Sequence, residues 1–180
     1  MRPYQAGTGG SNYGNQWSVS GAGGGLVYVT ATNGTIRVNG KIDASGRHGN
    51  EFSSGYGGGS GGTILLESRR FFGGETGQLI AKGGDTTPQS TVHSGAGGGG
   101  RIAVWCGEPW NANLRPGRIV KSETPLSGEE VAASFAYAGT YSVAPGTPTG
   151  SNIREQNYGA AGTVWFCYVR EKTGVMLIFR

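Results

Sequence analysis

The chain has 180 residues and a formal net charge of +4, from 15 Lys and Arg against 11 Asp and Glu. The positive excess is small and scattered, with no basic stripe, so a nucleic acid is a poor candidate for a partner. No apolar run approaches the roughly 18 residues that a membrane-spanning helix needs, which predicts no membrane span. Glycine is the outlier, with 37 residues, against a usual share of roughly 7%.

This glycine content has two ordinary explanations, and the sequence argues against both. Collagen requires glycine at every third position, and no such period runs along this chain. Disorder requires few apolar residues, whereas 36% of this chain is hydrophobic, and those residues gather into short runs. The glycine-rich stretches are therefore expected to alternate with strands of a folded domain.

In chain order, residues 1–24 are predicted to be a partial leading loop, because SGAGGG at 20–25 recurs at 94–99. Three short strands are predicted next: LVYVT, TIRVN and KIDAS, separated by Asn33-Gly34 and Asn39-Gly40. Apolar and polar residues alternate in them with the period of two that strands require. Asn-Gly pairs supply the residues with positive φ that tight corners need.

Two landmarks repeat along the chain. A glycine-rich stretch precedes an apolar strand four times, and its last glycine stands at 25, 62, 100 and 162, giving intervals of 37, 38 and 62. A second landmark, glycine followed by a polar and an apolar residue, lies 15, 15 and 17 residues after the first three of these glycines. A constant offset between two landmarks over three copies indicates a structural repeat. The second landmarks are Gly40-Lys41-Ile42, Gly77-Gln78-Leu79 and Gly117-Arg118-Ile119.

The predicted fold is all-β: a right-handed parallel β-helix with about three strands per turn, glycine-rich loops and a repeat of 37–38 residues. One repeat cannot bury its apolar face alone, so stacked neighbours complete the core. An antiparallel β-hairpin stack or sandwich is the alternative. We expect a single domain over residues 1–180, with repeats at 25–61, 62–99 and 100–121, an insertion at 122–158 that is either a hairpin or a degenerate turn, and a terminal turn at 159–180.

Alternation assigns two faces to the first strand of each repeat. One face is uniformly apolar and is predicted to be the core; it holds Val27 and Val29, Ile64 and Leu66, Ile102 and Val104, and Val164 and Phe166. The opposite face carries Tyr28, Trp105 and Trp165, which are the candidate binding residues. Exposed aromatic rings on a sheet can stack on sugar rings. Alternatively, inserted loops or a neighbouring chain cover them, as exposed apolar patches usually mark an interface.

The two cysteines fall on different faces in this register, with Cys106 toward the core and Cys167 outward. The expectation is two free thiols, one of them buried. A disulfide remains the alternative, because neighbouring turns bring the two strands close.

The search for catalytic or cofactor-binding groups predicts none. A sugar-cleaving enzyme would need paired carboxylates on successive turns, but Asp43 aligns with Ile80 and Val120, and Glu67 aligns with Thr30 and Trp105. His48 and His93 lie at different offsets from their strands and are expected to be solvated. The G-x-G-x-x-G match at residues 57–62 follows a loop and opens a strand, unlike a dinucleotide site. No metal ligands and no cofactor are therefore predicted, and the chain is expected not to be an enzyme.

A GGGSGG run leading into TILLE, and the closing GAAGTVWF, resemble glycine-rich repeats in large secreted, adhesin-like proteins of environmental bacteria. The resemblance implies a parallel β-helix and an extracellular or cell-surface location, although MRPYQAGTGG lacks an apolar signal core. It implies a structural or adhesive role, with a polysaccharide, a matrix component or a sister chain as partner. A polysaccharide lyase or hydrolase and a phage or host-recognition tip domain are the alternatives.

Overall fold

The computed structural model describes residues 4–11, 20–49, 56–86, 94–107, 115–122, 136–150 and 153–170, of which 115–122 and 169–170 are described by their backbone alone. This part of the chain consists of strands and extended segments, with one short 3-10 helix, η1 (Glu155–Asn157). The strands are β1 (Leu26–Arg37), β2 (Lys41–Asp43), β3 (Thr63–Phe72), β4 (Gln78–Ile80), β5 (Arg101–Gly107), β6 (Arg115–Ser122), β7 (Thr140–Ser142) and β8 (Thr163–Arg170). The all-β prediction is confirmed.

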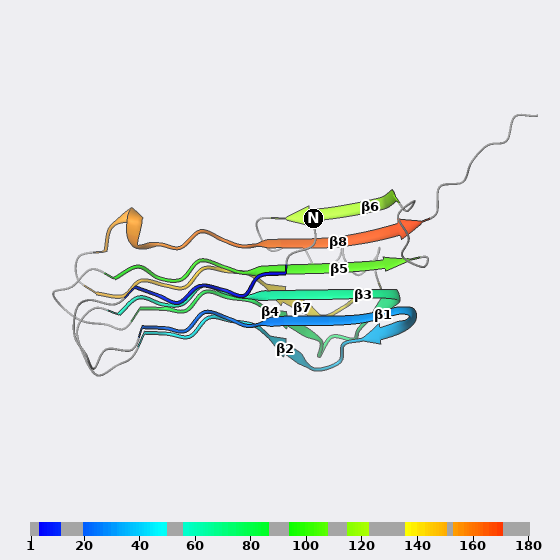
Figure 1. Ribbon diagram of the computed structural model, residues 1–180, viewed down its shortest axis with the longest axis horizontal. Coiled ribbons are helices and arrows are strands. Elements are labelled where there is room, and N and C mark those ends of the chain that lie inside the picture. The colour runs from blue at the N-terminus through cyan, green and yellow to red at the C-terminus, as the bar shows by residue number, and fades with distance from the viewer. Residues whose placement is uncertain are drawn as a thin grey trace, which may run out of the picture.

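The strands form two sheets, with the order β1-β3-β5-β8-β6 in the larger and β2-β4-β7 in the smaller (Figure 1). All pairs are parallel except β6 with β8. Leu26 pairs with Thr63, Thr63 with Arg101, and Arg101 with Thr163, so the pairing offsets are 37, 38 and 62 residues. These offsets equal the intervals between the glycine landmarks. The predicted stacking of each strand on its counterpart is confirmed, and the antiparallel hairpin alternative is wrong for these strands.

The prediction of two separate strands before residue 40 is wrong. LVYVT and TIR belong to the single strand β1, and the register shifts between Ala31 and Thr35. Asn33-Gly34 lies at that irregularity, where the ribbon of β1 bends back (Figure 1). β1 has two more residues than β3 across this irregularity, and extra residues in one strand can bend it without ending its pairing. A corner sequence therefore does not separate two strands here.

The third copy of the second landmark was also misplaced. In the smaller sheet, Gln78 pairs with Thr140 and Leu79 with Tyr141, so Gly139 takes the position that Gly40 and Gly77 hold. Gly117 instead lies within β6, which runs antiparallel to β8. Residues 136–150, expected within an insertion, therefore continue the regular pattern. The landmark was assigned to Gly117 because β6 also contains a glycine followed by a polar and an apolar residue.

The main apolar core lies among the strands and includes Ile64, Leu66, Leu79, Ile102, Val104, Val164 and Phe166. Residues of the predicted core face in β3, β5 and β8 are fully buried, as alternation requires. In β1, Val29 is 39% exposed and Val27 is only partly buried. These two residues depart from the prediction because β1 is the edge strand of the larger sheet, and among the described strands only β3 pairs with it.

The glycine-rich segments, predicted to be loops, are extended chains that lie side by side (Figure 1). We call them the glycine bundle: residues 7–11, 20–25, 44–49, 57–62, 81–86, 94–100, 143–149 and 159–162. Their main-chain hydrogen bonds run between segments, as from Gly59 N–H to the Arg47 carbonyl and from Gly84 N–H to the Gly59 carbonyl. Within a segment, donors to the same neighbour recur every third residue, as at Gly59 and Gly62. Three residues per turn without internal hydrogen bonds is the geometry of polyproline II.

Most bundle glycines are needed because the segments lie too close together for a side chain to fit between them. Among the described glycines, only Gly107 and Gly150 have a positive φ, and neither forms a contact between bundle segments. A Cβ added at most bundle glycines would come within 3.0 Å of a neighbouring main-chain atom. At Gly24, for example, it would lie 2.5 Å from the nitrogen of Gly62. Collagen needs glycine at its crowded axis for the same reason.

Candidate functional site

The three aromatic residues expected on the outer face of the larger sheet have different surroundings. Tyr28 is 44% exposed, Trp165 is half-buried, and Trp105 is buried, with 7% of its surface exposed. Tyr28 and Trp165 lie in one cross-strand row, separated by Leu65 and Ala103, and Trp105 lies in the adjacent row. The structure therefore does not unite them into one open platform, and it makes Trp105 inaccessible to a stacking ligand.

Trp105 belongs to a second, smaller apolar cluster on the outer side of the sheet, together with Leu65, Ala103 and Cys167. The surroundings of Trp105 therefore fit the alternative in which protein covers the outer aromatic residues better than the prediction of an exposed binding residue. Alternation fixed the face correctly, but the face of a strand does not by itself determine exposure.

Tyr28 has an open ring and a well-defined polar contact. Its hydroxyl donates a 2.8 Å hydrogen bond to Oε2 of Glu67 on the neighbouring strand. That hydrogen bond, then partial burial and the negative charge of Glu67, raise the pKa of Tyr28 above its usual value. Tyr28 therefore stays neutral at physiological pH, and its hydroxyl occupies Oε2 of Glu67, whose Oε1 is buried.

Tyr4, which the sequence did not single out, completes this group. It is 51% exposed, and its ring meets that of Tyr28 edge to face with 5.7 Å between the centroids. We call Tyr4, Tyr28 and Glu67 the tyrosine site. Two exposed aromatic rings, one of which carries a hydroxyl bound to Glu67, can contact the apolar face of a sugar and one of its hydroxyl groups.

Residues 4–11 position Tyr4 and are not a free loop. Gly7 N–H donates to the Gly24 carbonyl at 2.8 Å, and Ser60 N–H donates to the Thr8 carbonyl at 2.9 Å. The Thr63 hydroxyl donates to the Gln5 carbonyl at 2.6 Å. The spacing of three between Gly7 and Gly10 was the available signal in the sequence, since both residues lie close to neighbouring main chains.

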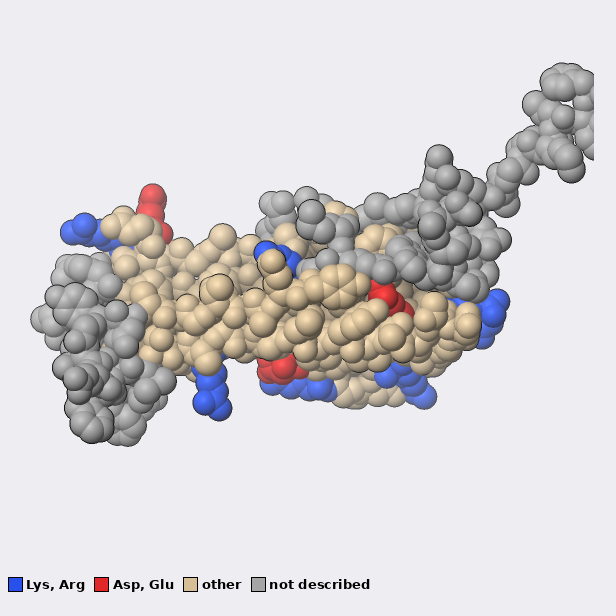
Figure 2. Space-filling model, viewed as in Figure 1, with Lys and Arg blue, Asp and Glu red and all other residues tan. Residues whose placement is uncertain are grey.

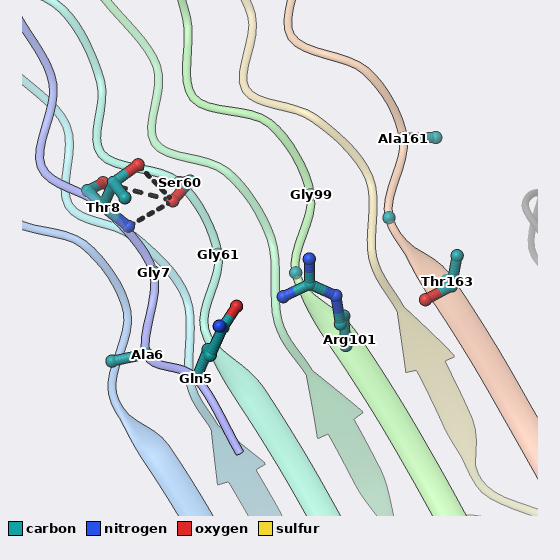
Figure 3. A pocket seen from close by; sticks show the side chains of 12 residues that line it. Gln5, Ala6, Gly7, Thr8, Ser60, Gly61, Gly99, Arg101, Ala161 and Thr163 are labelled. Atoms are coloured by element: carbon teal, nitrogen blue, oxygen red, sulfur yellow. Dashed lines mark hydrogen bonds between the residues drawn. The ribbon is translucent and has the colours of Figure 1, made fainter. Parts of the chain in front are cut away.

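A groove of about 310 Å³ opens beside residues 4–11, where the glycine bundle meets the larger sheet. One side is formed by residues 5–8 and the other by 161–163, and between them lie residues 60–61 and 99–101 (Figure 3). Thr8 N–H donates a 2.7 Å hydrogen bond to the Ser60 hydroxyl at one margin. Among the described lining residues, only Arg101 has a charged side chain. Elsewhere the lining is largely main chain, because so many of these residues are glycine.

Both cysteines are free and buried. Cys106 lies in the main core and Cys167 in the outer cluster, so their faces and the free thiols were predicted correctly. The exposure expected for Cys167 is wrong, because it pairs with Trp105 and packs in the cluster with it. Burial, and then the neighbouring Cys167, raise the pKa of Cys106 to about 12. Burial raises the pKa of Cys167 to about 11. Both thiols are therefore protonated and unreactive at neutral pH.

In the described strand pairings, no carboxylate residue is paired with another. Asp43 pairs with Ile80, as predicted, and the third position of that row is Ser142, not Val120. Burial opposes ionisation of Asp43, but hydrogen bonds from Lys41 and Ser45 outweigh it and lower its pKa.

His48 is exposed, and its Nδ1 lies 3.3 Å from Oδ2 of Asp85 in the glycine bundle. His93 lies outside the described residues. Among the described residues, no cluster of His, Cys, Asp and Glu could hold a metal ion.

The charged side chains on the face shown in Figure 2 are few and separated on a largely uncharged surface. Within the described residues, no helix is long and apolar enough to cross a membrane. The sequence matches no protein-family model, no curated protein and no solved structure. The resemblance to adhesin-like surface proteins therefore stays a prediction.

Proposed function

We propose that the chain is a structural and adhesive module of a cell surface or extracellular matrix, a rigid scaffold whose outer face contacts a polysaccharide. The observation that carries this proposal is the tyrosine site. It presents two exposed tyrosine rings, with the Tyr28 hydroxyl held by Glu67, beside a sheet whose strands and glycine segments are joined by main-chain hydrogen bonds.

The proposed architecture is a right-handed parallel β-helix in which the glycine bundle completes each turn. The chain runs twice through the same order, a strand of the larger sheet, a strand of the smaller sheet, then two glycine segments, and a third time with β6 added between β5 and β7. Its successive strands pair in parallel at the offsets of the sequence repeat. Crossover connections between parallel strands of one sheet are almost always right-handed, which supports this handedness.

The chemistry of the tyrosine site favours a neutral or basic sugar over an acidic one. Glu67 places a carboxylate beside Tyr28, and a uronic acid there would meet like charge. A hydroxyl group of a neutral sugar can donate to the Tyr28 hydroxyl oxygen while the apolar face of the sugar lies on a ring. The site is open and shallow, so we expect contact with the side of a polymer chain.

The test is binding of the full chain to a panel of insoluble polysaccharides, neutral, basic and acidic, by co-sedimentation. Tyr28→Ala should weaken binding about tenfold, because it removes a stacking ring and the hydrogen bond to Glu67. Tyr158→Ala is the matched control, since Tyr158 is an exposed tyrosine, at 57%, outside the larger sheet. Equal loss in both variants, or release of new reducing ends from the polysaccharide, would overturn the proposal.

A further inference from the structure

Four segments of the glycine bundle lie next to one another as one layer: residues 20–25, 57–62, 94–100 and 159–162. Hydrogen bonds join each to the next, from Gly24 N–H to the Ser60 carbonyl, from Gly61 N–H to the Gly98 carbonyl, and from Gly99 N–H to the Ala160 carbonyl, each 2.8 Å long. Rod-like chains packed side by side leave a furrow between each neighbouring pair. We call the furrow between residues 20–25 and 57–62 the first furrow, and that between 57–62 and 94–100 the second.

The first furrow is filled by residues 4–11 of the same chain. This segment donates on one side, from Gly7 to the Gly24 carbonyl and from Gly10 to the Gly21 carbonyl, both at 2.8 Å. It accepts on the other side, from Ser60 N–H at 2.9 Å and from Gly57 N–H at 3.3 Å. A Cβ on Gly7 would lie 2.7 Å from the Gly61 carbonyl oxygen, so only glycine fits against the layer there.

The repeat register generates the same main-chain groups along the second furrow. Thr63 pairs with Leu26 and Arg101 with Thr63, so Gly61 and Gly58 correspond to Gly24 and Gly21, and Gly98 and Gly95 correspond to Ser60 and Gly57. Within the described part of the chain, the carbonyls of Gly58 and Gly61 accept no main-chain hydrogen bond, and the N–H groups of Gly95 and Gly98 donate none. These are the counterparts of the four groups that hold residues 4–11.

The groove described above lies over this second furrow. Its middle includes Gly61 and Gly99, and residues 5–8, already bound in the first furrow, form one side (Figure 3). A Cβ added at Gly98 would meet nothing closer than the Ala160 carbonyl oxygen at 3.4 Å, so the surface is open at that position. The groove therefore lies over the strand end of the second furrow and includes Gly61, while Gly58, Gly95 and Gly98 continue the furrow beyond it along the glycine bundle.

We propose that the second furrow binds an extended peptide in the polyproline II conformation with glycine at every third position, held as residues 4–11 are held in the first. The peptide donates to the carbonyls of Gly58 and Gly61 and accepts from the N–H groups of Gly95 and Gly98. Arg101 lies at the strand end of the groove, corresponding to Thr63, which bonds Gln5. A peptide running in the direction of residues 4–11 brings its N-terminal part to Arg101, so an acidic side chain there strengthens binding.

The experiment titrates the ¹⁵N-labelled full chain with the synthetic peptide YQAGTGGS, the sequence of residues 4–11, and follows amide chemical shifts up to millimolar concentrations. We expect saturable shifts at Gly95 and Gly98. The control peptide YQAATGAS should produce none, because its two alanines correspond to glycines that contact the layer. The peptide YEAGTGGS should bind more tightly than the first, and high salt should abolish that difference.

A proline variant tests the donor directly. Gly98→Pro removes the N–H group while keeping an extended φ, and should weaken binding of YQAGTGGS about fivefold, the worth of one hydrogen bond. Gly40→Ala is the matched control, because a Cβ at Gly40 meets nothing within 4 Å. Circular dichroism and thermal melting establish that both variants fold.

Absence of shifts, equal binding of the alanine peptide, or full affinity in a folded Gly98→Pro variant would each overturn the proposal. Shifts at Gly57 and Ser60 in place of Gly95 and Gly98 would mean that the peptide displaces residues 4–11 from the first furrow, which also overturns it. The polysaccharide assay with Tyr28→Ala is independent of these outcomes.

Discussion

The strand half and the glycine bundle use opposite means of holding chains together. In the strand half, apolar side chains such as Leu66 and Phe166 fill the space between the sheets. In the glycine bundle, main-chain atoms of one segment meet main-chain atoms of the next, and the glycines at those contacts place no side chain between them. One half is stabilised mainly by burial of apolar surface, and the other by close main-chain packing and hydrogen bonds.

The comparison shows how a glycine-rich sequence can form ordered structure. Glycine loses more conformational entropy on folding than any other residue, so a single extended glycine segment in water is unfavourable. Each bundle segment except residues 7–11 is continuous with a strand whose pairing fixes its register. The strands therefore align the glycine segments, and alignment lets their hydrogen bonds form together.

The largest expected effect lies in the strand half. Phe166 is fully buried, and its ring centroid lies 5.4 Å from that of Tyr141 and 6.2 Å from those of Phe71 and Tyr137. Phe166→Ala should lower the free energy of unfolding by about 3–5 kcal/mol, because it leaves a cavity among these rings. Denaturant titration measures the loss. A change within about 0.5 kcal/mol, as expected for an exposed site, would contradict the assigned core.

An intermediate effect is expected in the glycine bundle from two adjacent glycines. Gly24→Ala should cost about 1–3 kcal/mol, because the new Cβ would press against the main chains of Ala44 and Gly62. Gly25→Ala is the matched control, since nothing lies within 4 Å of its Cβ position. It should stabilise by about 0.4–1 kcal/mol through the entropy of the unfolded chain. Equal effects of the two variants would show that main-chain contact does not govern this half.

A third effect, which is absent near neutral pH and grows as pH rises, comes from the buried thiols of the strand half. In the unfolded chain a thiol ionises near pH 8.5, whereas Cys106 has a pKa of about 12 and Cys167 of about 11 in the fold. Between these values the unfolded state has lost a proton that the native state retains. Stability should therefore be unaffected below the unfolded pKa and fall as pH rises, by about 1.4 kcal/mol per unit for each thiol.

Unfolding titrations at alkaline pH measure this slope. The double variant Cys106→Ala and Cys167→Ala should be less stable near neutrality but show a shallower decline above about pH 9. If stability falls with pH as steeply in the double variant as in the unchanged chain, other groups cause the decline. Tyr137, whose pKa burial raises to about 12, is then the first candidate.

Much of the strand half was predictable from the sequence, and most of the glycine bundle was not. Strand registers followed from the glycine intervals, and the faces of Ile64 and Cys106 followed from alternation. Within each bundle segment, glycines that contact a neighbouring segment recur every third residue, as at Gly21 and Gly24. Other glycines stand next to them, so the sequence does not show which ones make the contacts. Which glycines lie inside depends on neighbours 37 or 38 residues away, so local sequence alone does not reveal them.

The candidate site was predicted in part. Tyr28 was assigned to the outer face, and it is exposed there. The burial of Trp105 could not be predicted, because it depends on packing with Leu65 and Cys167 from other repeats. Tyr4 was missed because its position depends on residues 4–11 lying in the first furrow, a contact between segments far apart in sequence.

The arrangement of extended chains has a mechanical consequence. Strands and glycine segments both run along the long axis of the molecule (Figure 1). A strand rises about 3.3 Å per residue and a polyproline II chain about 3.1 Å, so both are close to full extension. A force along this axis can extend the chains only a little further. It must therefore break many transverse main-chain hydrogen bonds at the same time. Along its length the molecule should therefore resist stretching as a cable of parallel fibres does.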